Sequence, residues 1–370
     1  MRKLFKTTGK LLLIILAVLL VAGVAFAQLS PQLGGTPKQD YTASGHYKDG
    51  EFYNPVPTSV MTGGSQFAAL RHMLFDKMPD KKPPGPLPMQ FLDSLTITQK
   101  TPDLVRVTWF GHSASLVEIA GQNILLDPML SIKMGPIGGV APTRYNPRVP
   151  IAAEQLPAID AVLISHDHYD HLDYQTVLKI KEKTKHFYVP LGAGAHLLRW
   201  GVPATKITEV TWGDSVRLPG LTLISTPTRH FSGRGLTNRN STFWTSWVLK
   251  TPTKRLFYSG DGGYGPHFQQ IGAQYGPFDL ALMECGQYDA QWAEIHMRPE
   301  QSVQAALDLR ARVMQPVHWG AFTEANHAWN DPVKRAFVEA ARRQLPLTTP
   351  ELGQPVVLDG RPLPQQQWWQ

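Results

Sequence analysis

The pattern of apolar and polar positions divides the chain into stretches of different character. Residues 11–26 form one uncharged apolar run, and residues 28–102 are rich in proline, glycine and glutamine. From residue 103 onward, short apolar runs bounded by turn residues alternate with amphipathic stretches. Such alternation is typical of a mixed α/β domain. We therefore predict an extended N-terminal segment over residues 28–102, a folded domain over residues 103–345 and a C-terminal tail over residues 346–370.

The predicted elements of this domain fall into two sheet-rich halves of similar content. Strands are predicted at 105–109, 115–119, 123–127, 161–164, 186–189 and 206–211, within 221–259, and at 278–285 and 313–317. Helices are predicted at 174–183, 193–200, 299–310 and 332–342. Two such halves fit an αβ/βα sandwich, in which two sheets face each other and helices cover their outer faces.

Directly after the apolar run 161–164, the chain reads His166-Asp-His168-Tyr-Asp170-His171. A strand followed by alternating ligands would place His166 and His168 near one cation and turn Asp170 and His171 toward a second. Imidazole and carboxylate together suit zinc, manganese or iron better than calcium or magnesium. The alternative, a solvated polar loop that happens to be rich in histidine, is disfavoured because unpaired polar groups are costly to bury. The motif therefore predicts a metal site at the end of this strand.

The pattern H-x-H-x-D-H resembles the signature of the metallo-β-lactamase fold superfamily, which implies a four-layer αβ/βα sandwich. The resemblance also implies that further ligands end later strands, and His230, Asp261 and His318 each follow an apolar run in that order. Any one of them alone is more often a structural residue, whereas their joint occurrence favours ligands. By the resemblance, one metal is held by His166, His168 and His230, the other by Asp170, His171 and His318, and Asp261 lies between the two.

Several other segments look like the branch that contains N-acyl-phosphatidylethanolamine-hydrolysing phospholipase D and bacterial outer-membrane-associated relatives. These segments are 109–114, 126–128, 164–173, 246–249, 258–264, 276–280, 296–300 and 318–322. The resemblance spans about residues 103–340 and so covers the whole predicted domain. It implies a phosphodiesterase that acts on phospholipid-like substrates.

The resemblance implies two zinc ions as cofactors, with manganese or iron as alternatives. A metal-bridging hydroxide would attack phosphorus or an acyl carbon, with Asp170 and Asp261 as catalytic ligands. His296 is the third predicted catalytic residue, because in the relatives a histidine at this motif faces the substrate and could protonate the leaving alkoxide. The alternative for His296 is a capping or core histidine.

Four residues near the motif receive supporting roles. We expect His112 to orient a ligand and Asp127 to fix the turn at a strand end. Asp167 and Asp173 are expected to cap the helix that follows the motif. The single cysteine, Cys285, cannot form an intramolecular disulfide and is expected to be a small buried hydrophobe near the site.

The substrate is less firmly predicted than the metal site. Loops 234–240 and 284–289 depart from the lipase relatives, and ascorbate-phosphate lactonases share the start of the domain and the ligands. A lactonase or carboxylic ester hydrolase is therefore the alternative function, and a non-catalytic metal-binding envelope protein is a third. Arg234, Arg239 and Arg298 are the candidate phosphate contacts. Aromatic residues that would form either an acyl-chain wall or core are Trp212, Trp244, Trp247, Tyr264, Tyr288 and Trp292.

The N-terminus has the pattern of an export signal. Arg2, Lys3, Lys6 and Lys10 precede the apolar run, and 25–27 offers a small-x-small cleavage site. Cleavage gives a periplasmic protein and retention gives a membrane-anchored one, so in both cases we expect the domain in the bacterial cell envelope. Within the extension, Phe67, Leu70, Leu74 and Met78 recur at helical spacing. This amphipathic stripe either packs on the domain or lies on a membrane surface.

The charge balance bears on the partners. Four of the +7 formal charges lie in the leader, which leaves +3 for the rest of the chain. A nucleic-acid partner therefore gains little support. We expect a small-molecule or phospholipid-like substrate and contact with a membrane surface through the N-terminus, while the oligomeric state is left open.

Overall fold

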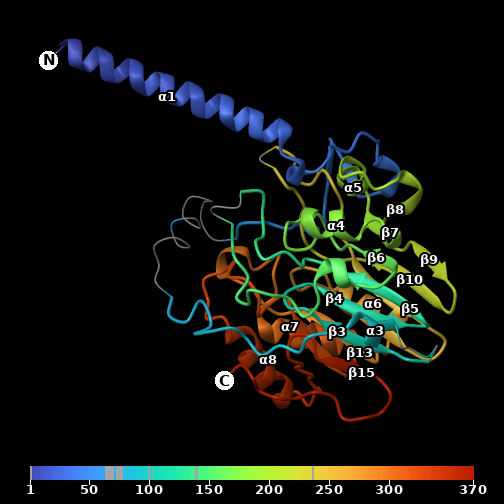
Figure 1. Cartoon of the computed structure of the whole chain (residues 1–370). Coiled ribbons are helices and arrows are strands. Elements are labelled where there is room, and N and C mark those ends of the chain that lie inside the picture. The colour runs from blue at the N-terminus through green and yellow to red at the C-terminus, as the bar shows by residue number, and fades with distance from the viewer. Residues whose placement is uncertain are drawn as a thin grey trace.

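The computed structural model describes residues 2–62, 71, 78–98, 101, 103–137, 141–235 and 237–370, with the side chains of residues 2–9 and 27 left out. Two sheets form the centre of the molecule, and the predicted αβ/βα sandwich is confirmed (Figure 1). Phe67, Leu70 and Leu74 of the amphipathic stripe lie outside the described residues.

The first sheet has seven strands, antiparallel at one side and parallel from β5 to β8. Their spatial order is β15 (Pro355–Val357), β3 (Arg106–Trp109), β4 (Ser115–Ile119), β5 (Gln122–Leu126), β6 (Ile159–Leu163), β7 (Thr184–Pro190) and β8 (Ile207–Val210). The second sheet has six strands, antiparallel from β9 to β12 and parallel from β12 to β14. Their order is β14 (Met314–Val317), β13 (Leu280–Glu284), β12 (Arg255–Tyr258), β11 (Ser246–Lys250), β10 (Leu221–Thr226) and β9 (Ser215–Leu218).

Three apolar cores hold the four layers together. The central core joins inward-facing side chains of both sheets, such as Val107 and Leu163 with Leu249 and Leu282. A second core packs α4 (Tyr174–Ile180) and α5 (Gly194–Arg199) on the outer face of the first sheet, with Ile97 of α3 (Ser94–Thr98) in the same cluster. A third packs α6 (His267–Tyr275), α7 (Pro299–Asp308) and α8 (Asp331–Arg342) on the second sheet.

The ends of the chain add elements that the sequence analysis did not predict. Residues 346–370, predicted as a tail, contribute β15 at the edge of the first sheet. Trp369 is 1% exposed and belongs to the central core. The C-terminal residues are therefore part of the folded domain.

Strand β9 and helix α6, which lie inside the domain, were not predicted from the sequence either.

The N-terminal extension contains little regular structure but packs on the domain. It holds the hairpin β1 (Tyr47–Lys48) and β2 (Glu51–Phe52), whose Phe52 packs on Phe243. Short 3₁₀ turns occur here and elsewhere: η1 (Pro31–Leu33), η2 (Thr42–Ser44), η3 (Ala153–Gln155), η4 (Ala204–Lys206) and η5 (Ala290–Trp292).

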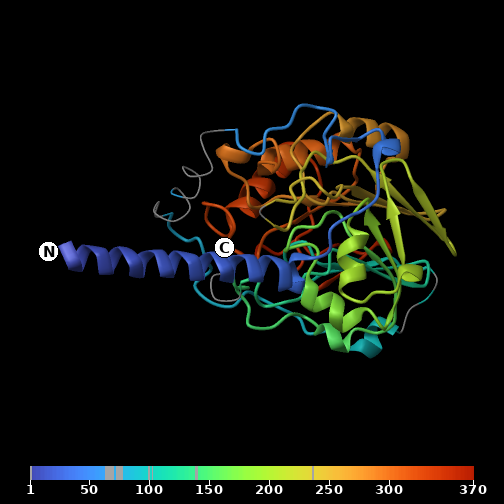
Figure 2. The ribbon, with the colours of Figure 1, turned by 90° about the horizontal axis from the view of Figure 1, so that it is seen from above.

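The first helix, α1 (Arg2–Leu29), projects away from the sandwich in both views (Figures 1 and 2). Its apolar side chains are exposed from Leu11 to Val21. Among the helical residues whose side chains are described, none forms a stretch long and apolar enough to cross a membrane.

Candidate metal centre

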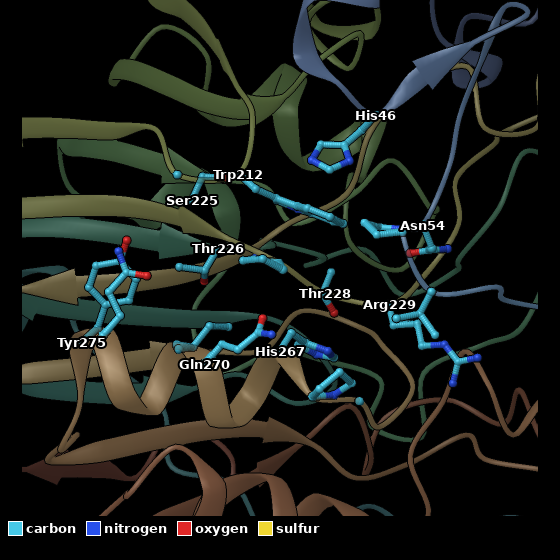
Figure 3. Close-up of a pocket in the computed structure, with 18 residues that line it drawn as sticks. His46, Asn54, Trp212, Ser225, Thr226, Thr228, Arg229, His267, Gln270 and Tyr275 are labelled. Atoms are coloured by element: carbon cyan, nitrogen blue, oxygen red, sulfur yellow. The ribbon is translucent and has the colours of Figure 1, made fainter.

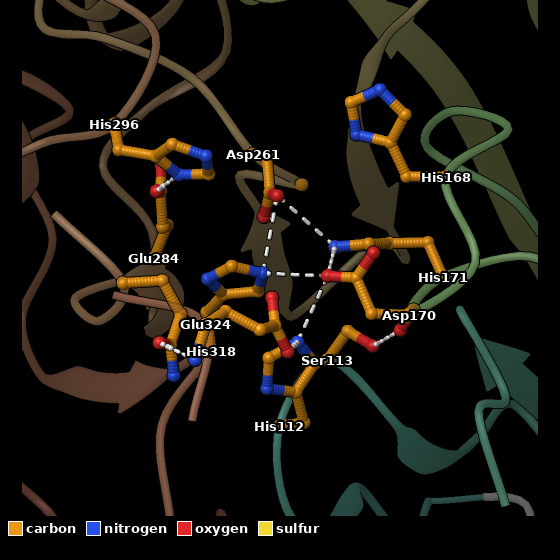
Figure 4. Close-up of polar contacts among 12 residues, drawn as sticks. His112, Ser113, His168, Asp170, His171, Asp261, Glu284, His296, His318 and Glu324 are labelled. Atoms are coloured by element: carbon orange, nitrogen blue, oxygen red, sulfur yellow. Dashed lines mark hydrogen bonds and ion pairs between the residues drawn. The ribbon is translucent and has the colours of Figure 1, made fainter. Parts of the chain in front are cut away.

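The candidate ligands meet at one edge of the sandwich because each follows the end of a strand. His166, His168, Asp170 and His171 come after β6, His230 after β10, Asp261 after β12 and His318 after β14. The carboxyl ends of parallel strands share one edge of a sheet, and the two sheets present these edges to each other. All seven predicted ligands are thereby brought together. Figure 4 shows five of them, His168, Asp170, His171, Asp261 and His318.

Three imidazoles form the first group. His166 Nε2 lies 2.9 Å from His168 Nδ1, which lies 3.3 Å from His230 Nε2. Burial lowers the pKa of His166 and of His230 well below the usual range, and the neighbouring imidazoles add to that effect. Neutral imidazoles each present a lone pair, so this group has the donor set of a metal site.

A carboxylate organises the second group. Asp170 Oδ2 lies 3.0 Å from His318 Nε2, 3.2 Å from His171 Nε2 and 2.9 Å from His112 Nε2. Burial acts to lower the pKa of His171 and His318, but the Asp261 and Asp170 carboxylates outweigh it and hold both pKa values well above the usual range. The two carboxylates therefore favour positive charge at this group.

Asp261 connects the two groups. Its Oδ2 lies 3.1 Å from both His171 Nε2 and His318 Nε2, and 3.8 and 3.9 Å from His166 Nε2 and His230 Nε2. Within the described chain, Asp261 Oδ1 is buried without a hydrogen-bond partner, and His171 Nε2 faces the carboxylates of Asp170 and Asp261. Buried polar atoms are rarely left unpaired, so these atoms fit a cation held between the two groups.

The supporting residues hold these ligands from behind. Asp127 accepts hydrogen bonds from His171 Nδ1 at 2.7 Å, from the Ser165 backbone at 2.7 Å and from the Tyr258 hydroxyl at 2.6 Å. It therefore orients His171 as well as ending its strand. His112 contacts Asp170, as expected of a residue that orients a ligand.

The two acidic residues that flank the motif do different things. Asp173 caps α4 by accepting from the backbone N–H groups of Gln175 and Thr176. Asp167 does not cap this helix. It accepts from the Gly233 N–H at 2.8 Å and lies 3.2 Å from His196 Nε2, and so ties the motif to the loop after His230.

The backbone is strained at three residues of the centre. His112, Asp127 and His318 have φ values of 56°, 38° and 66°. Side chains other than glycine rarely adopt this region, and such conformations persist only where the surroundings enforce them. Here the His318 N–H donates to the His112 carbonyl at 2.9 Å, and the His112 N–H donates to the Trp319 carbonyl at 3.1 Å.

His296 lies beside the ligands, and the sequence analysis missed the residue that holds it. Its Nδ1 pairs with the carboxylate of Glu284, which is fully buried and also accepts from the Gly262 N–H at 2.7 Å. The ring of His296 lies 5.2 Å from that of His230 and 5.6 Å from that of His318. Glu284 is the last residue of β13 and begins the segment 284–289, which was noted only as a departure from the lipase relatives; that departure was the available signal.

A second missed residue is Glu324, whose Oε1 lies 3.4 Å from His112 Nε2. Burial raises the pKa of Glu324 well above the usual range, and the Asp170 carboxylate raises it further. Glu324 lies two residues after the segment 318–322 that the resemblance singled out, and this proximity was the available signal.

A cavity of about 260 Å³ opens onto the centre. Its polar lining residues are His168, Asp170, Asp261, Gln287, His296 and Glu324. Its apolar side chains are Val60, Met61, Phe231, Trp292 and Ile295. Of the aromatic residues proposed for an acyl-chain wall, Trp292 alone is among the described residues lining this cavity.

The candidate arginines do not share one role. Arg234 is buried, and its guanidinium donates to the carbonyls of Asp167, Leu172 and Gln32, so it holds the backbone. Arg239 lines a neighbouring groove that also contains His230 and Lys48. Arg298 precedes α7 and is exposed. Cys285 is fully buried, and burial raises the pKa of its thiol, which leaves it a structural residue.

The N-terminal extension reaches the centre through Asn54. Asn54 Nδ2 donates to the His230 carbonyl at 2.7 Å, and Asn54 Oδ1 accepts from Trp244 Nε1 at 3.0 Å. Residues that orient a ligand commonly change metal affinity when they are replaced. Asn54 therefore positions a candidate ligand that lies 176 residues away in the sequence.

We expect Asn54→Ala to weaken zinc binding by about 10-fold, because the backbone of His230 loses its donor. In Asn54→Asp, the new carboxylate still accepts from Trp244 Nε1 but repels the His230 carbonyl oxygen. Zinc binding should therefore weaken at least as much as in Asn54→Ala. Competition with a fluorescent zinc chelator measures both affinities. Wild-type affinity in both variants would contradict the positioning role.

Comparison with known proteins shows which family the chain resembles. Residues 122–319, more than half of the chain, match the family model of the β-lactamase superfamily domain. An uncharacterized protein of Mycobacterium tuberculosis is 41% identical over 331 residues, covering 88% of this chain and 87% of that protein.

Two further relatives carry informative names. N-acyl-phosphatidylethanolamine-hydrolyzing phospholipase D 1 of Caenorhabditis elegans is 33% identical over 227 residues, covering 58% of this chain and 64% of the relative. Outer membrane protein RomA of Klebsiella pneumoniae is 57% identical over 100 residues, covering 27% of this chain and 75% of the relative. Among solved structures, a metallo hydrolase from Ignicoccus hospitalis shares the fold at 24% identity, with a TM-score of 0.52 over 70% of this chain and all of that one.

Proposed function

Because this chain belongs to the β-lactamase superfamily and is a metal-dependent hydrolase related to N-acyl-phosphatidylethanolamine-hydrolysing phospholipases D, we propose that it cleaves phosphodiester bonds in phospholipid-like substrates. One observation carries the proposal. Two groups of candidate ligands meet at Asp261, beside a cavity with apolar walls and His296.

The donor set supports two zinc ions, with manganese or iron as alternatives. His166, His168 and His230 would hold one ion, Asp170, His171 and His318 the other, and Asp261 would contact both. When bound, such ions supply Lewis acidity and an activated water nucleophile.

The residues around the ligands divide the remaining tasks. Met61, Trp292 and Ile295 offer an apolar surface for the substrate's chains. The neighbouring groove contains the cationic side chains of Lys48 and Arg239 for contact with the phosphate, and the carboxylates of Asp49 and Glu51 for a cationic headgroup. Because Glu284 holds His296 at Nδ1, the Nε2 of His296 is free to donate a proton to the departing alkoxide oxygen.

We further propose that the protein works in the cell envelope, exported and in contact with a membrane surface through its N-terminus. The likeness to an outer membrane protein and the basic residues before the exposed apolar face of α1 support this location. Cell fractionation with N-terminal sequencing of the purified protein tests it, and recovery of the intact chain in the cytosol would contradict it.

A panel of three substrates tests the activity of the zinc-loaded protein. It contains bis(4-nitrophenyl) phosphate, N-acyl phosphatidylethanolamine in detergent micelles, and a γ-lactone. We expect phosphodiester cleavage to fall by at least about 100-fold in His168→Ala, because a ligand is lost. His186→Ala, which removes a half-buried histidine from β7, should retain full activity.

The panel also separates the alternative functions. Turnover of the lactone alone would replace the proposal by a carboxylic ester hydrolase that uses the same residues. Bound zinc without turnover of any of the three would contradict the phosphodiesterase and favour a metal-binding envelope protein.

A further inference from the structure

A second cavity, of about 490 Å³, lies beside the loop that carries His230 (Figure 3). It shares no lining residue with the cavity of the metal centre, as far as the structure describes the chain. The N-terminal extension, the β8–β9 turn, the end of β10 and helix α6 each contribute to its walls. Segments far apart in the sequence, within residues 46–56, 212–229 and 265–275, thus line one space.

One wall of this cavity is a fixed aromatic surface. The ring of Trp212 lies 4.7 Å from that of His46 and 4.6 Å from that of Phe243. Trp212 Nε1 donates to the Trp244 carbonyl at 2.8 Å, which holds the indole in place. A preordered flat surface of this kind favours a planar ring as its occupant.

The opposite wall presents an unused polar atom. His267, on α6, is 8% exposed and faces the cavity in Figure 3. Its Nε2 has no hydrogen-bond partner in the described chain, and the same is true of His46 Nδ1 on the aromatic side. Native proteins rarely leave buried polar atoms unpaired. A ligand hydroxyl or carbonyl that reached His267 would supply the missing partner.

The cavity has no charge available for a ligand. None of its 18 lining residues carries a carboxylate. The guanidinium of Arg229 is already engaged, because Nη2 lies 3.1 Å from Glu294 Oε2 and Nε donates to Thr58 Oγ1 at 2.9 Å. Burial, with the charge of Arg229 behind it, lowers the pKa of His267 to about 3, so the ring is neutral at physiological pH. An ion would lose hydration here without gaining a counter-charge.

We propose that this cavity is a binding site for an uncharged aromatic compound that carries a hydroxyl or carbonyl group. The ring lies against Trp212, and the polar group pairs with His267 Nε2. The proposal stands apart from the phosphodiesterase activity, because it requires neither the ligand residues nor a metal.

The site lies next to the backbone of two candidate metal ligands. Thr228, which lines the cavity, donates from Oγ1 to the Asp261 carbonyl at 2.8 Å. Asn54, which also lines it, donates to the His230 carbonyl. A bound compound therefore contacts residues that hold both Asp261 and His230.

Titration calorimetry of the full chain with 2-naphthol tests the proposal, with 2-naphthoate as an anionic probe of the same ring. We expect 2-naphthol to bind at least about 10-fold more tightly than 2-naphthoate, because the carboxylate is desolvated without compensation. His267→Phe keeps a ring but removes the nitrogen, and should weaken 2-naphthol binding by about 10-fold. His186→Phe, the same substitution on β7, should leave the affinity unchanged.

A rim variant tests the location without touching the core. Gln274 is exposed on α6 at the edge of the cavity, so Gln274→Trp should fold normally and cover the opening, with loss of 2-naphthol binding. Thermal melting confirms that each variant is folded. Absence of 2-naphthol binding to the wild type, equal affinity for 2-naphthoate, or unchanged affinity in folded His267→Phe and Gln274→Trp would each overturn the proposal.

Discussion

Asp261→Asn is expected to lower phosphodiester hydrolysis by at least about 100-fold, more than the loss of a residue that merely orients a ligand. The substitution keeps the shape of the side chain but removes the charge of the one carboxylate that approaches histidines of both groups. Two cations placed close together without this charge would repel each other more strongly. We therefore expect the variant to retain less zinc per chain than the wild type.

Metal content measured by mass spectrometry, together with kcat/KM on bis(4-nitrophenyl) phosphate, checks both effects. Asp308→Asn is the matched control, because Asp308 is the last residue of α7, accepts a hydrogen bond from the Tyr264 hydroxyl and does not belong to the groups of candidate ligands. Wild-type activity and zinc content in Asp261→Asn would exclude Asp261 as a shared ligand.

Trp369→Ala is expected to destabilise the fold by about 3–5 kcal/mol, the usual cost of removing a large buried aromatic side chain. Trp369 is 1% exposed, and its ring lies 6.1 Å from those of Trp319 and Phe337. Asn330 Nδ2 also donates to the Trp369 carbonyl at 2.8 Å, which fixes the end of the chain against α8. Urea unfolding followed by tryptophan fluorescence and circular dichroism measures the free energy of unfolding.

The effect should extend to the metal centre, because Trp319 directly follows His318. Trp319 stacks on Trp109 at 5.5 Å and on Trp368 at 5.1 Å, so the C-terminal aromatic residues hold the segment that presents this candidate ligand. Gln367→Ala, an exposed change two residues earlier, serves as control. A loss below about 1 kcal/mol in Trp369→Ala would show that the central core does not depend on this side chain.

That the candidate ligands lie together could be predicted from the sequence, because each of them follows a recognisable local pattern. Three histidines and an aspartate within six residues mark a strand end, and His230, Asp261 and His318 each follow an apolar run. A strand needs only a short pattern of this kind to be recognised. The same logic predicted the sandwich, since both sheets alternate with amphipathic helices.

What the sequence did not reveal depends on contacts between distant residues. Strand β15 has three residues in a stretch rich in proline and glutamine, so its pairing with β3 could not be predicted from periodicity. Asn54 reaches the centre without any predicted strand end or motif beside it. Glu324 and Glu284 lie close to segments that the sequence singled out, but the contacts of their carboxylates with His112 and His296 appear only in the fold. These residues come together only in the folded chain, so local sequence patterns do not predict their contacts.

The pairing of β15 with β3 has a consequence for the biosynthesis of the protein. This ladder joins residues about 250 positions apart, and Trp369 completes the packing behind His318. A ribosome that has made the histidine-rich motif has not yet made the residues that close the sandwich around it. Such non-local pairing is slow to form, because a long loop must close first. The centre is therefore complete only after residues 355–369 have left the ribosome, and we expect a metal ion to be held in the native geometry only from that point on.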